Sequence, residues 1–172
     1  GPGKQPAVSV DAIITKTQLL IADIEVPGSL LANESTEIRP EVSGKLVQLN
    51  VREGHFVSRG ALLAKLYDGD LQAQKRKLEV QLKIADQTEK RQAELLKIQG
   101  ISQQEYDLSL LQVYNLNADI DIINEAIRKT EIRSPFSGKL GFKNISPGAY
   151  ISPSTIICTV SQVDQLKLQF TI

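Results

Sequence analysis

The amino-acid sequence predicts an α+β protein in which a small β-sandwich is split by an inserted helical hairpin. Three observations support this fold class. A pattern of short strands in residues 35–68 recurs in residues 131–163. The intervening residues 69–130 are mostly strong helix formers. Aromatic residues make up only 5% of the 172-residue chain, and there is no Trp or Met, so a single large globular core is not expected.

An internal repeat is the strongest of these observations. Glu37-Ile38-Arg39 recurs as Glu131-Ile132-Arg133, which lies 94 positions later (131 − 37). A match that keeps one offset over a long stretch indicates a duplicated unit. The same offset joins Ser43-Gly44-Lys45-Leu46 to Ser137-Gly138-Lys139-Leu140, Val51 to Ile145, Gly54 to Gly148, Phe56 to Tyr150, and Leu62 to Ile156.

Each copy of the repeat has the composition of short strands joined by turns. β-Branched and aromatic residues favour strands, whereas glycine suits turns and positive φ. We therefore expect turns near Gly44, Gly54 and Gly60 in the first copy, and near Gly138, Gly148 and Pro153 in the second. Because so small a unit cannot cover its own apolar face, the two copies are expected to pack about a pseudo-twofold axis as a β-sandwich.

Residues 69–130 predict two antiparallel helices. In the second half of the segment, apolar residues alternate at spacings of three and four, the pattern of a coiled-coil seam. The first half has a weaker seam, because Lys75, Glu89 and Gln92 interrupt it. The predicted seam residues are Val113, Leu116, Ile120, Ile123 and Ile127 in the second half, and Leu71, Leu78, Leu82, Ala85 and Leu96 in the first.

The turn of the hairpin is expected at residues 97–103. Gly100 fits a helix C-cap, and Ser102 fits the N-cap of the second helix. Glu105, three residues after Ser102, completes a capping-box pattern. Each helix of about 30 residues is roughly 45 Å long, so the hairpin must project from the sandwich. Such a projection is suited to reaching a partner, and the alternatives are a structural spacer or a dimerisation arm.

Composition argues against several classes of function. The 20 Lys and Arg balance the 20 Asp and Glu, so no basic surface for nucleic acid is expected. The longest apolar runs are four residues, as in Leu19–Ala22, against the roughly 20 that cross a bilayer. One histidine, His55, and one cysteine, Cys158, form neither a metal site nor a catalytic dyad at familiar spacings. We therefore expect no enzyme, no cofactor and no metal.

With the repeat and the hairpin in place, the sequence resembles the periplasmic adaptor subunits, or membrane fusion proteins, of bacterial tripartite efflux pumps. The matching stretches include residues 38–46, 51–57, 132–138 and 147–151. The resemblance implies that the sandwich is a lipoyl-like barrel-sandwich hybrid, formed by residues 35–68 and 131–163. It also implies that residues 69–130 are the coiled-coil hairpin of that family.

The hairpin turn carries the family's tip signature, an Arg followed by a Leu four residues later and a Ser seven residues after that. Arg91, Leu95 and Ser102 fill these positions, with Gly100 and Ile101 in the turn itself. The resemblance implies that these residues contact the helical tip of a TolC-type outer-membrane channel. Without the resemblance, Arg91 is a solvated flank, Leu95 a seam residue and Ser102 only a helix cap.

The two ends of the chain are assigned as follows. Residues 1–7 are interpreted as a linker, because Gly1-Pro2-Gly3 is typical of the remnant of a removed tag. The resemblance assigns residues 8–34 to the N-terminal strands of a truncated β-barrel domain, with Val8–Pro27 as the entering strand. It assigns residues 164–172 to the return into that domain. We expect these terminal strands to have few partners and to be disordered or irregularly paired.

The resemblance implies a connector in the periplasm of a Gram-negative bacterium, anchored at the inner membrane in the full-length protein. Its partners would be the TolC-type channel, an inner-membrane transporter and further copies of itself in a ring. A transporter of the resistance-nodulation-division (RND) type is favoured, and an ABC-type exporter or secretion system is the alternative. A lipoyl or biotinyl carrier is a remote alternative, because a long helical segment replaces the turn that would hold the modified lysine.

Overall fold

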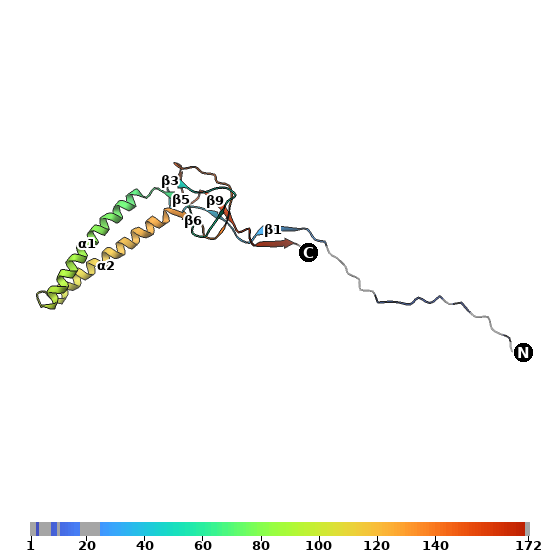
Figure 1. The fold of residues 1–172 in the computed structure, drawn as a ribbon, viewed down its shortest axis with the longest axis horizontal. Coiled ribbons are helices and arrows are strands. Elements are labelled where there is room, and N and C mark those ends of the chain that lie inside the picture. The colour runs from blue at the N-terminus through green and yellow to red at the C-terminus, as the bar shows by residue number, and fades with distance from the viewer. Residues whose placement is uncertain (1–2, 4–7, 10, 18–24, 171–172) are drawn as a thin grey trace.

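The computed structural model describes residues 3, 8–9, 11–17 and 25–170. Within these residues the chain forms a small sandwich of two sheets, a long helical arm and a two-stranded ribbon, and the arm and the ribbon extend from different sides of the sandwich (Figure 1). The predicted α+β architecture, a sandwich interrupted by a helical hairpin, is confirmed.

The sandwich interleaves the two copies of the repeat. The first copy supplies β2 (Ser35–Ile38), β3 (Gly44–Leu49), β4 (Phe56–Val57) and β5 (Leu62–Leu66), and the second supplies β6 (Glu131–Arg133), β7 (Gly138–Leu140), β8 (Tyr150–Ile151) and β9 (Cys158–Ser161). One sheet has the strand order β2-β9-β7-β4 and the other has the order β6-β5-β3-β8. Exchanging each strand for its repeat counterpart converts one order into the other, so the sheets are related by the predicted pseudo-twofold symmetry.

Backbone hydrogen bonds repeat this symmetry. The Gly54 amide donates to the Leu140 carbonyl at 2.8 Å, and its counterpart, the Gly148 amide, donates to the Leu46 carbonyl at 2.7 Å. Each copy therefore ties its glycine turn to a strand of the other copy. Neither copy can complete its hydrogen bonds alone, which explains why the two copies match at one constant offset of 94 residues.

The repeated Glu-Ile-Arg motif also has one structural role in both copies. Arg39 Nη2 lies 2.7 Å from a Glu37 carboxylate oxygen, and Arg133 Nη2 lies 2.8 Å from one of Glu131. The other guanidinium nitrogen of each arginine donates to the backbone of a loop in the opposite copy, at Ser154 O and Gly60 O respectively. The isoleucine between the charged residues is buried in both cases. The motif thus joins each edge strand to the core and to the other copy.

The core consists largely of residues related by the same offset of 94. Leu46 and Leu140 are both buried, as are Leu63 and Ile157. Cys158 is buried at the position that Ala64 occupies in the first copy, and burial raises the pKa of its thiol to about 11. The complete apolar cluster is Ile38, Leu46, Val51, Leu63, Ala64, Leu66, Ile132, Leu140, Ile151, Ile157, Cys158 and Val160.

The four repeat glycines divide into two classes. Gly54 and Gly148 have positive φ, 73° and 95°, as a turn glycine requires. Gly44 and Gly138 lie beside the expected turns rather than in them, because bends at residues 41–42 and 135–137 precede the two glycines, which begin strands β3 and β7. They are needed for close packing instead: a Cβ on Gly138 would lie 2.7 Å from the carbonyl oxygen of Ser161. A Cβ on Gly44 would lie 3.3 Å from a Leu66 methyl group.

The ribbon joins the two ends of the described chain. Strand β1 (Gly28–Ala32) pairs antiparallel with β10 (Leu166–Phe170), from Gly28 opposite Phe170 to Ala32 opposite Leu166. The expected irregular pairing is therefore wrong, since the strands pair with each other in one continuous register. The strand expected over residues 8–27 is also displaced: residues 8–9, 11–17 and 25–27 have no regular structure, and the rest of that range lies outside the described residues.

The arm, defined here as α1 (Gly69–Lys97) and α2 (Gln103–Lys129), is a pair of packed antiparallel helices. The α2 seam residues Val113, Leu116, Ile120, Ile123 and Ile127 are all buried or half-buried. Lys75, Glu89 and Gln92 do not interrupt the α1 seam, because they are half-buried at seam spacing between its apolar members. The seam is therefore continuous but partly polar. Within the described residues, neither helix is long and apolar enough to cross a membrane.

Candidate docking site at the tip of the helical arm

The end of α1 is closed by a Schellman motif. The helix ends at Lys97, with Ile98 as its C-cap. The Gly100 amide donates to the Leu95 carbonyl at 2.7 Å, and the Gln99 amide donates to the Leu96 carbonyl at 3.0 Å. These bonds are the pair that defines the motif, and they satisfy carbonyls that the helix end would leave without partners.

The residue in the left-handed conformation is Gln99, not Gly100. Gln99 has a φ of 57°, and it is the only non-glycine residue with positive φ in the described part of the chain. The prediction that Gly100 is the helix C-cap is therefore wrong by two positions. Gly100 follows the left-handed residue, where a Cβ would lie 3.3 Å from the Leu95 carbonyl oxygen. The backbone strain is therefore at Gln99, whose side chain is exposed at the tip.

The start of α2 is closed by the capping box that the sequence indicates. The Glu105 amide donates to Ser102 Oγ at 3.2 Å, while the Ser102 amide donates to Glu105 Oε2 at 2.8 Å. Ser102 Oγ also donates to the same carboxylate oxygen at 2.9 Å. These bonds, the backbone one first, hold the pKa of Glu105 below its ordinary value. The turn over residues 98–102 is thus fixed from both sides by internal hydrogen bonds.

Arg91 and Leu95 lie one helical turn apart near the end of α1 and both are exposed. Leu95 is 41% exposed, and the seam position beside it is taken by Leu96. Ile98, in the turn, is 75% exposed. Among the residues described, the guanidinium of Arg91 makes one hydrogen bond, to Thr88 Oγ1 at 3.3 Å, and no ion pair. The tip therefore presents two apolar side chains and one cation without an ionic partner in the described chain.

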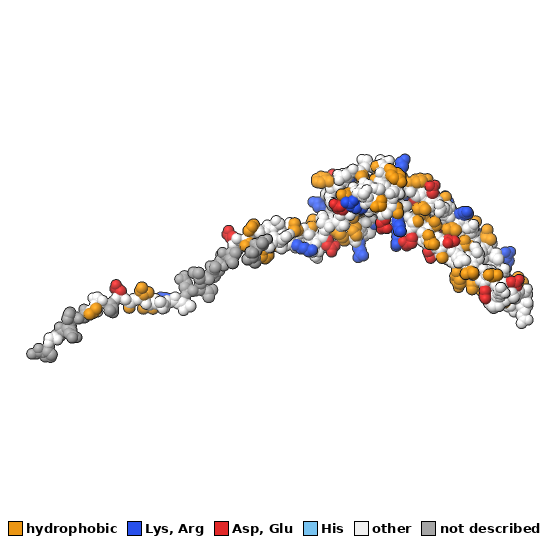
Figure 2. Space-filling model, turned by 180° about the vertical axis from the view of Figure 1, so that it is seen from behind, with side chains coloured by type: hydrophobic (Ala, Val, Ile, Leu, Met, Phe, Trp, Pro, Cys, Tyr) orange, Lys and Arg blue, Asp and Glu red, His pale blue; other side chains and the backbone are white. Residues whose placement is uncertain are grey.

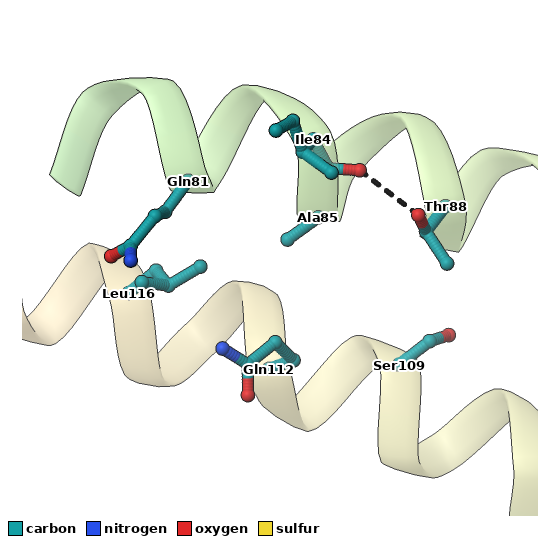
Figure 3. A pocket seen from close by; sticks show the side chains of 7 residues that line it. All are labelled: Gln81, Ile84, Ala85, Thr88, Ser109, Gln112 and Leu116. Atoms are coloured by element: carbon teal, nitrogen blue, oxygen red, sulfur yellow. Dashed lines mark hydrogen bonds between the residues drawn. The ribbon is translucent and has the colours of Figure 1, made fainter. Parts of the chain in front are cut away.

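A hollow of about 370 Å³ opens between the helices on the side of α1 that carries Thr88 (Figure 3). It arises because the seam residues Ala85 and Ser109 are small and leave space between the helices. Thr88 turns its hydroxyl back to the Ile84 carbonyl, at 3.0 Å, and so exposes its methyl group. The lining residues are Gln81, Ile84, Ala85 and Thr88 of α1 and Ser109, Gln112 and Leu116 of α2.

A polar layer crosses the seam between this hollow and the tip. The Tyr106 hydroxyl donates to Glu89 Oε1 at 2.8 Å, and this bond raises the pKa of Tyr106. The nearby Gln92 Oε1 is buried and has no hydrogen-bond partner in the described chain. The bond between the Tyr106 hydroxyl and the Glu89 carboxylate fixes the register of α1 relative to α2, as polar seam residues do in coiled coils.

The predicted site residues are thus brought together in part. Leu95, Gly100, Ile101 and Ser102 belong to one hydrogen-bonded turn, whereas Arg91 lies one turn lower on α1. Sequence reasoning missed Ile98, Gln99 and the hollow. The small residues Ala85 and Ser109 at seam spacing were the available signal for the hollow. No comparable signal predicts that Gln99, rather than Gly100, takes positive φ.

Comparison with known proteins places this geometry in a family. The family model described as RND MFP (resistance-nodulation-division membrane fusion protein), barrel-sandwich hybrid domain, matches residues 34–161. The chain is 32% identical over 191 aligned positions to the multidrug efflux pump subunit AcrA of Escherichia coli K12, covering 99% of this chain and 47% of that protein. It is 29% identical to the solvent efflux pump periplasmic linker SrpA of Pseudomonas putida, covering 96% and 44%.

Solved structures agree on the fold. A MacA-MexA chimera that contains the Pseudomonas aeruginosa MexA α-hairpin domain superposes with a TM-score of 0.78 at 23% identity, over 84% of this chain and 53% of that one. A putative efflux transporter from Bacteroides eggerthii gives a TM-score of 0.69 at 24% identity, over 86% and 47%. The chain spans about half the length of the curated relatives it matches.

The match over residues 34–161 covers both halves of the sandwich and the whole arm. It favours the RND-type alternative over the ABC-type one, and it identifies the helical insertion as the hairpin of an adaptor rather than the join of a lysine carrier. The chain belongs to the RND membrane fusion proteins, the periplasmic adaptor subunits of efflux pumps, a family of connectors rather than enzymes.

Proposed function

We propose that the full-length protein links an inner-membrane RND transporter to a TolC-type outer-membrane channel, and that the tip of the arm docks on the channel. The observation that carries this proposal is the exposed apolar pair Leu95 and Ile98 beside Arg91, at the far end of a rigid arm. The relatives, a multidrug efflux pump subunit and a periplasmic linker, support the same role.

The construction of the tip explains how it could dock without folding first. The Schellman motif and the capping box satisfy the backbone of the turn internally. The side chains of Arg91, Leu95 and Ile98 are therefore held in position and remain available to a partner. Ser102 already uses its hydroxyl proton on Glu105, so it can offer a partner only an acceptor lone pair while the capping box is intact.

The same proposal places several copies side by side in a ring, in the periplasm of a Gram-negative bacterium, with their arms directed at the channel. The ribbon of β1 and β10 would be the start of the β-barrel domain that the resemblance implies. Its exposed apolar residues support this role, because Leu30, Leu168 and Phe170 are 68%, 61% and 49% exposed and would be buried by further strands.

The test replaces Arg91 or Leu95 by Asp in the full-length protein, in cells that depend on it for efflux. Each change should abolish efflux and capture of the channel. Arg91→Asp replaces the cation of the tip by an anion, and Leu95→Asp replaces an apolar contact by a charged group. Far-UV circular dichroism should show unchanged helix content. Gln74→Asp is the matched control, since Gln74 is an exposed α1 residue far from the tip, and it should keep full efflux. Normal efflux by both tip variants would refute the docking assignment.

A further inference from the structure

The outer edge of α1 carries a row of cations. Arg76, Lys83, Lys90 and Lys97 recur every seven residues, and each follows a seam residue by one position. All four are exposed. Because successive residues of a helix are about 100° apart, this α1 row lies away from the seam, on one face of the arm at its outer edge. Lys97 pairs with Glu94 of its own helix at 2.7 Å, whereas the other three have no ion pair among the described residues.

The outer edge of α2 carries a different row with the same spacing. Asp107, Tyr114, Asp121 and Arg128 also recur every seven residues, and each follows a seam residue by one position. All four are exposed, and Arg128 pairs with Glu125 of its own helix. In an antiparallel pair, positions that follow the seam in this way lie on the same face of both helices. The α1 row and the α2 row therefore border one face of the arm from opposite edges.

The positions of the two rows along the arm match to within two residues. The bond between Glu89 and Tyr106 sets these two residues level across the seam. Both helices rise by the same amount per residue, so seven residues down α1 correspond to seven residues up α2. Lys90 thus lies within two residues, or about 3 Å along the helix axis, of the level of Asp107. The same small offset separates Lys83 from Tyr114 and Arg76 from Asp121. Within one arm these residues are on opposite edges, and no ion pair joins the two rows among the described residues.

We infer that the two rows meet between neighbouring copies, so that the α1 edge of one arm docks on the α2 edge of the next with the paired residues within about 3 Å of the same level. The structure then assigns ion pairs between Lys90 and Asp107 and between Arg76 and Asp121 of adjacent copies. Lys83 lies within about 3 Å of the level of Tyr114, an aromatic residue whose ring face attracts a cation. This inference rests on the proposed side-by-side assembly and identifies the surfaces and the register that form it.

Exposed apolar residues lie along the same two edges, and hydrophobic side chains are visible along the length of the arm (Figure 2). Val80 and Ile84 on α1 are 60% and 59% exposed. At matched heights Ile84 lies level with Leu111 on the neighbouring α2, and Val80 lies between the levels of Leu111 and Ala118. Such contacts would bury apolar surface that one arm cannot cover, while the charged rows fix the register.

The charge pattern also selects the direction of packing. A neighbour rotated end over end in the plane of the arm brings its own α1 edge, with a second cationic row, against the first. A neighbour turned upside down about an axis that runs across the arm, within its plane, keeps its α2 edge in contact. Its α2 row then lies on the opposite face from the α1 row. Only copies that point the same way bring opposite charges together along the row.

Disulfide trapping between mixed variants, each with one cysteine added to the arm, tests the register. The native Cys158 is buried and its thiol pKa is raised, so cysteines placed on the arm react first. Lys90→Cys mixed with Asp107→Cys should form cross-linked dimers about tenfold faster than Lys90→Cys mixed with Asp121→Cys. The second pair differs by 14 residues, or about 21 Å along the helix. Equal rates, including equally slow ones, would overturn the assigned edges.

Charge reversal tests the ion pairs themselves. Adding Arg76→Glu to both members of the Lys90/Asp107 cysteine pair should slow cross-linking at least threefold, and adding Asp121→Arg as well should restore it. Loss without restoration would refute the assigned pairing. These measurements use the chain alone, without a channel. Sedimentation that detects assembly without the predicted cross-link would refute only the edges, and the efflux test of the tip decides the docking role separately.

Discussion

The sandwich and the arm are stabilised in different ways. In the sandwich, residues from both copies of the repeat form one apolar cluster with side chains that are almost completely covered. In the arm, Leu116 is the only buried apolar residue among those described, and the seam includes Lys75, Glu89 and Gln92. The sandwich therefore depends on its core, whereas the arm depends on local features: helix propensity, two well-made caps and a narrow seam.

This difference suits the two parts to different tasks. A closely packed core resists change at almost every position, so the sandwich preserves a fixed base for the arm. An arm with few buried residues tolerates substitutions on its surface, and its exposed edges can be adapted to partners without loss of the fold. We expect functional residues on the arm and stability residues in the sandwich.

The largest expected effect comes from the same truncation made in each region. Leu63→Ala in the sandwich should lower the free energy of unfolding by about 4 kcal/mol, and Leu116→Ala in the arm by about 2 kcal/mol. Leu63 is 1% exposed within the cluster, whereas Leu116 lines the open hollow, where water can replace the lost side chain. Urea denaturation followed by far-UV circular dichroism measures both. Equal losses would show that the arm has a core as demanding as that of the sandwich.

The ease of prediction from the sequence differs between the same two regions. The sandwich could be predicted because the chain contains two copies of each structural position. Leu46 and Leu140 occupy the same buried position of the repeat, and Gly54 and Gly148 the same turn position. The repeat does not distinguish a glycine that turns the chain from one that permits close packing. Gly44 and Gly138 belong to the second kind, and their constraint comes from Leu66 and Ser161 far along the chain.

In the arm, the helices and the capping box could be predicted because they depend on neighbouring residues. The polar seam could not, since Glu89 is compatible with the seam only through Tyr106 on the other helix. The position of the left-handed residue also escaped prediction. Glycine is the usual choice there, and Gly100 lies one residue beyond the position that adopts positive φ.

A smaller effect is expected at the strained residue of the tip. Gln99→Gly should raise the free energy of unfolding by roughly 0.5–1 kcal/mol, because glycine adopts a φ of 57° without strain from a Cβ. Thermal denaturation followed by circular dichroism measures the change. Gln104→Gly is the matched control, since it places glycine within the first turn of α2 and should lower stability by about 1 kcal/mol. A loss of stability in Gln99→Gly would mean that the glutamine side chain stabilises the turn.

The smallest expected effect is the pH dependence of the capping box. The pKa of Glu105 is lowered in the folded chain, chiefly by the Ser102 amide and then by its hydroxyl. The unfolded chain therefore binds this proton more readily, and stability from the ionised carboxylate is present above the ordinary value of 4.5. That stability is lost as the pH falls through the lower, folded pKa.

Glu105→Gln isolates this contribution, because it keeps the shape of the side chain and removes its charge. The difference in stability between the parent chain and Glu105→Gln should be constant near neutral pH and should shrink as the solution is acidified below the ordinary value. Leu63→Ala replaces one side chain that does not titrate by another. The loss of stability that it causes should therefore stay nearly constant over the same pH interval. If the Glu105→Gln difference were also independent of pH, the carboxylate would stabilise the cap through geometry rather than charge, and the tip would keep its shape in acid.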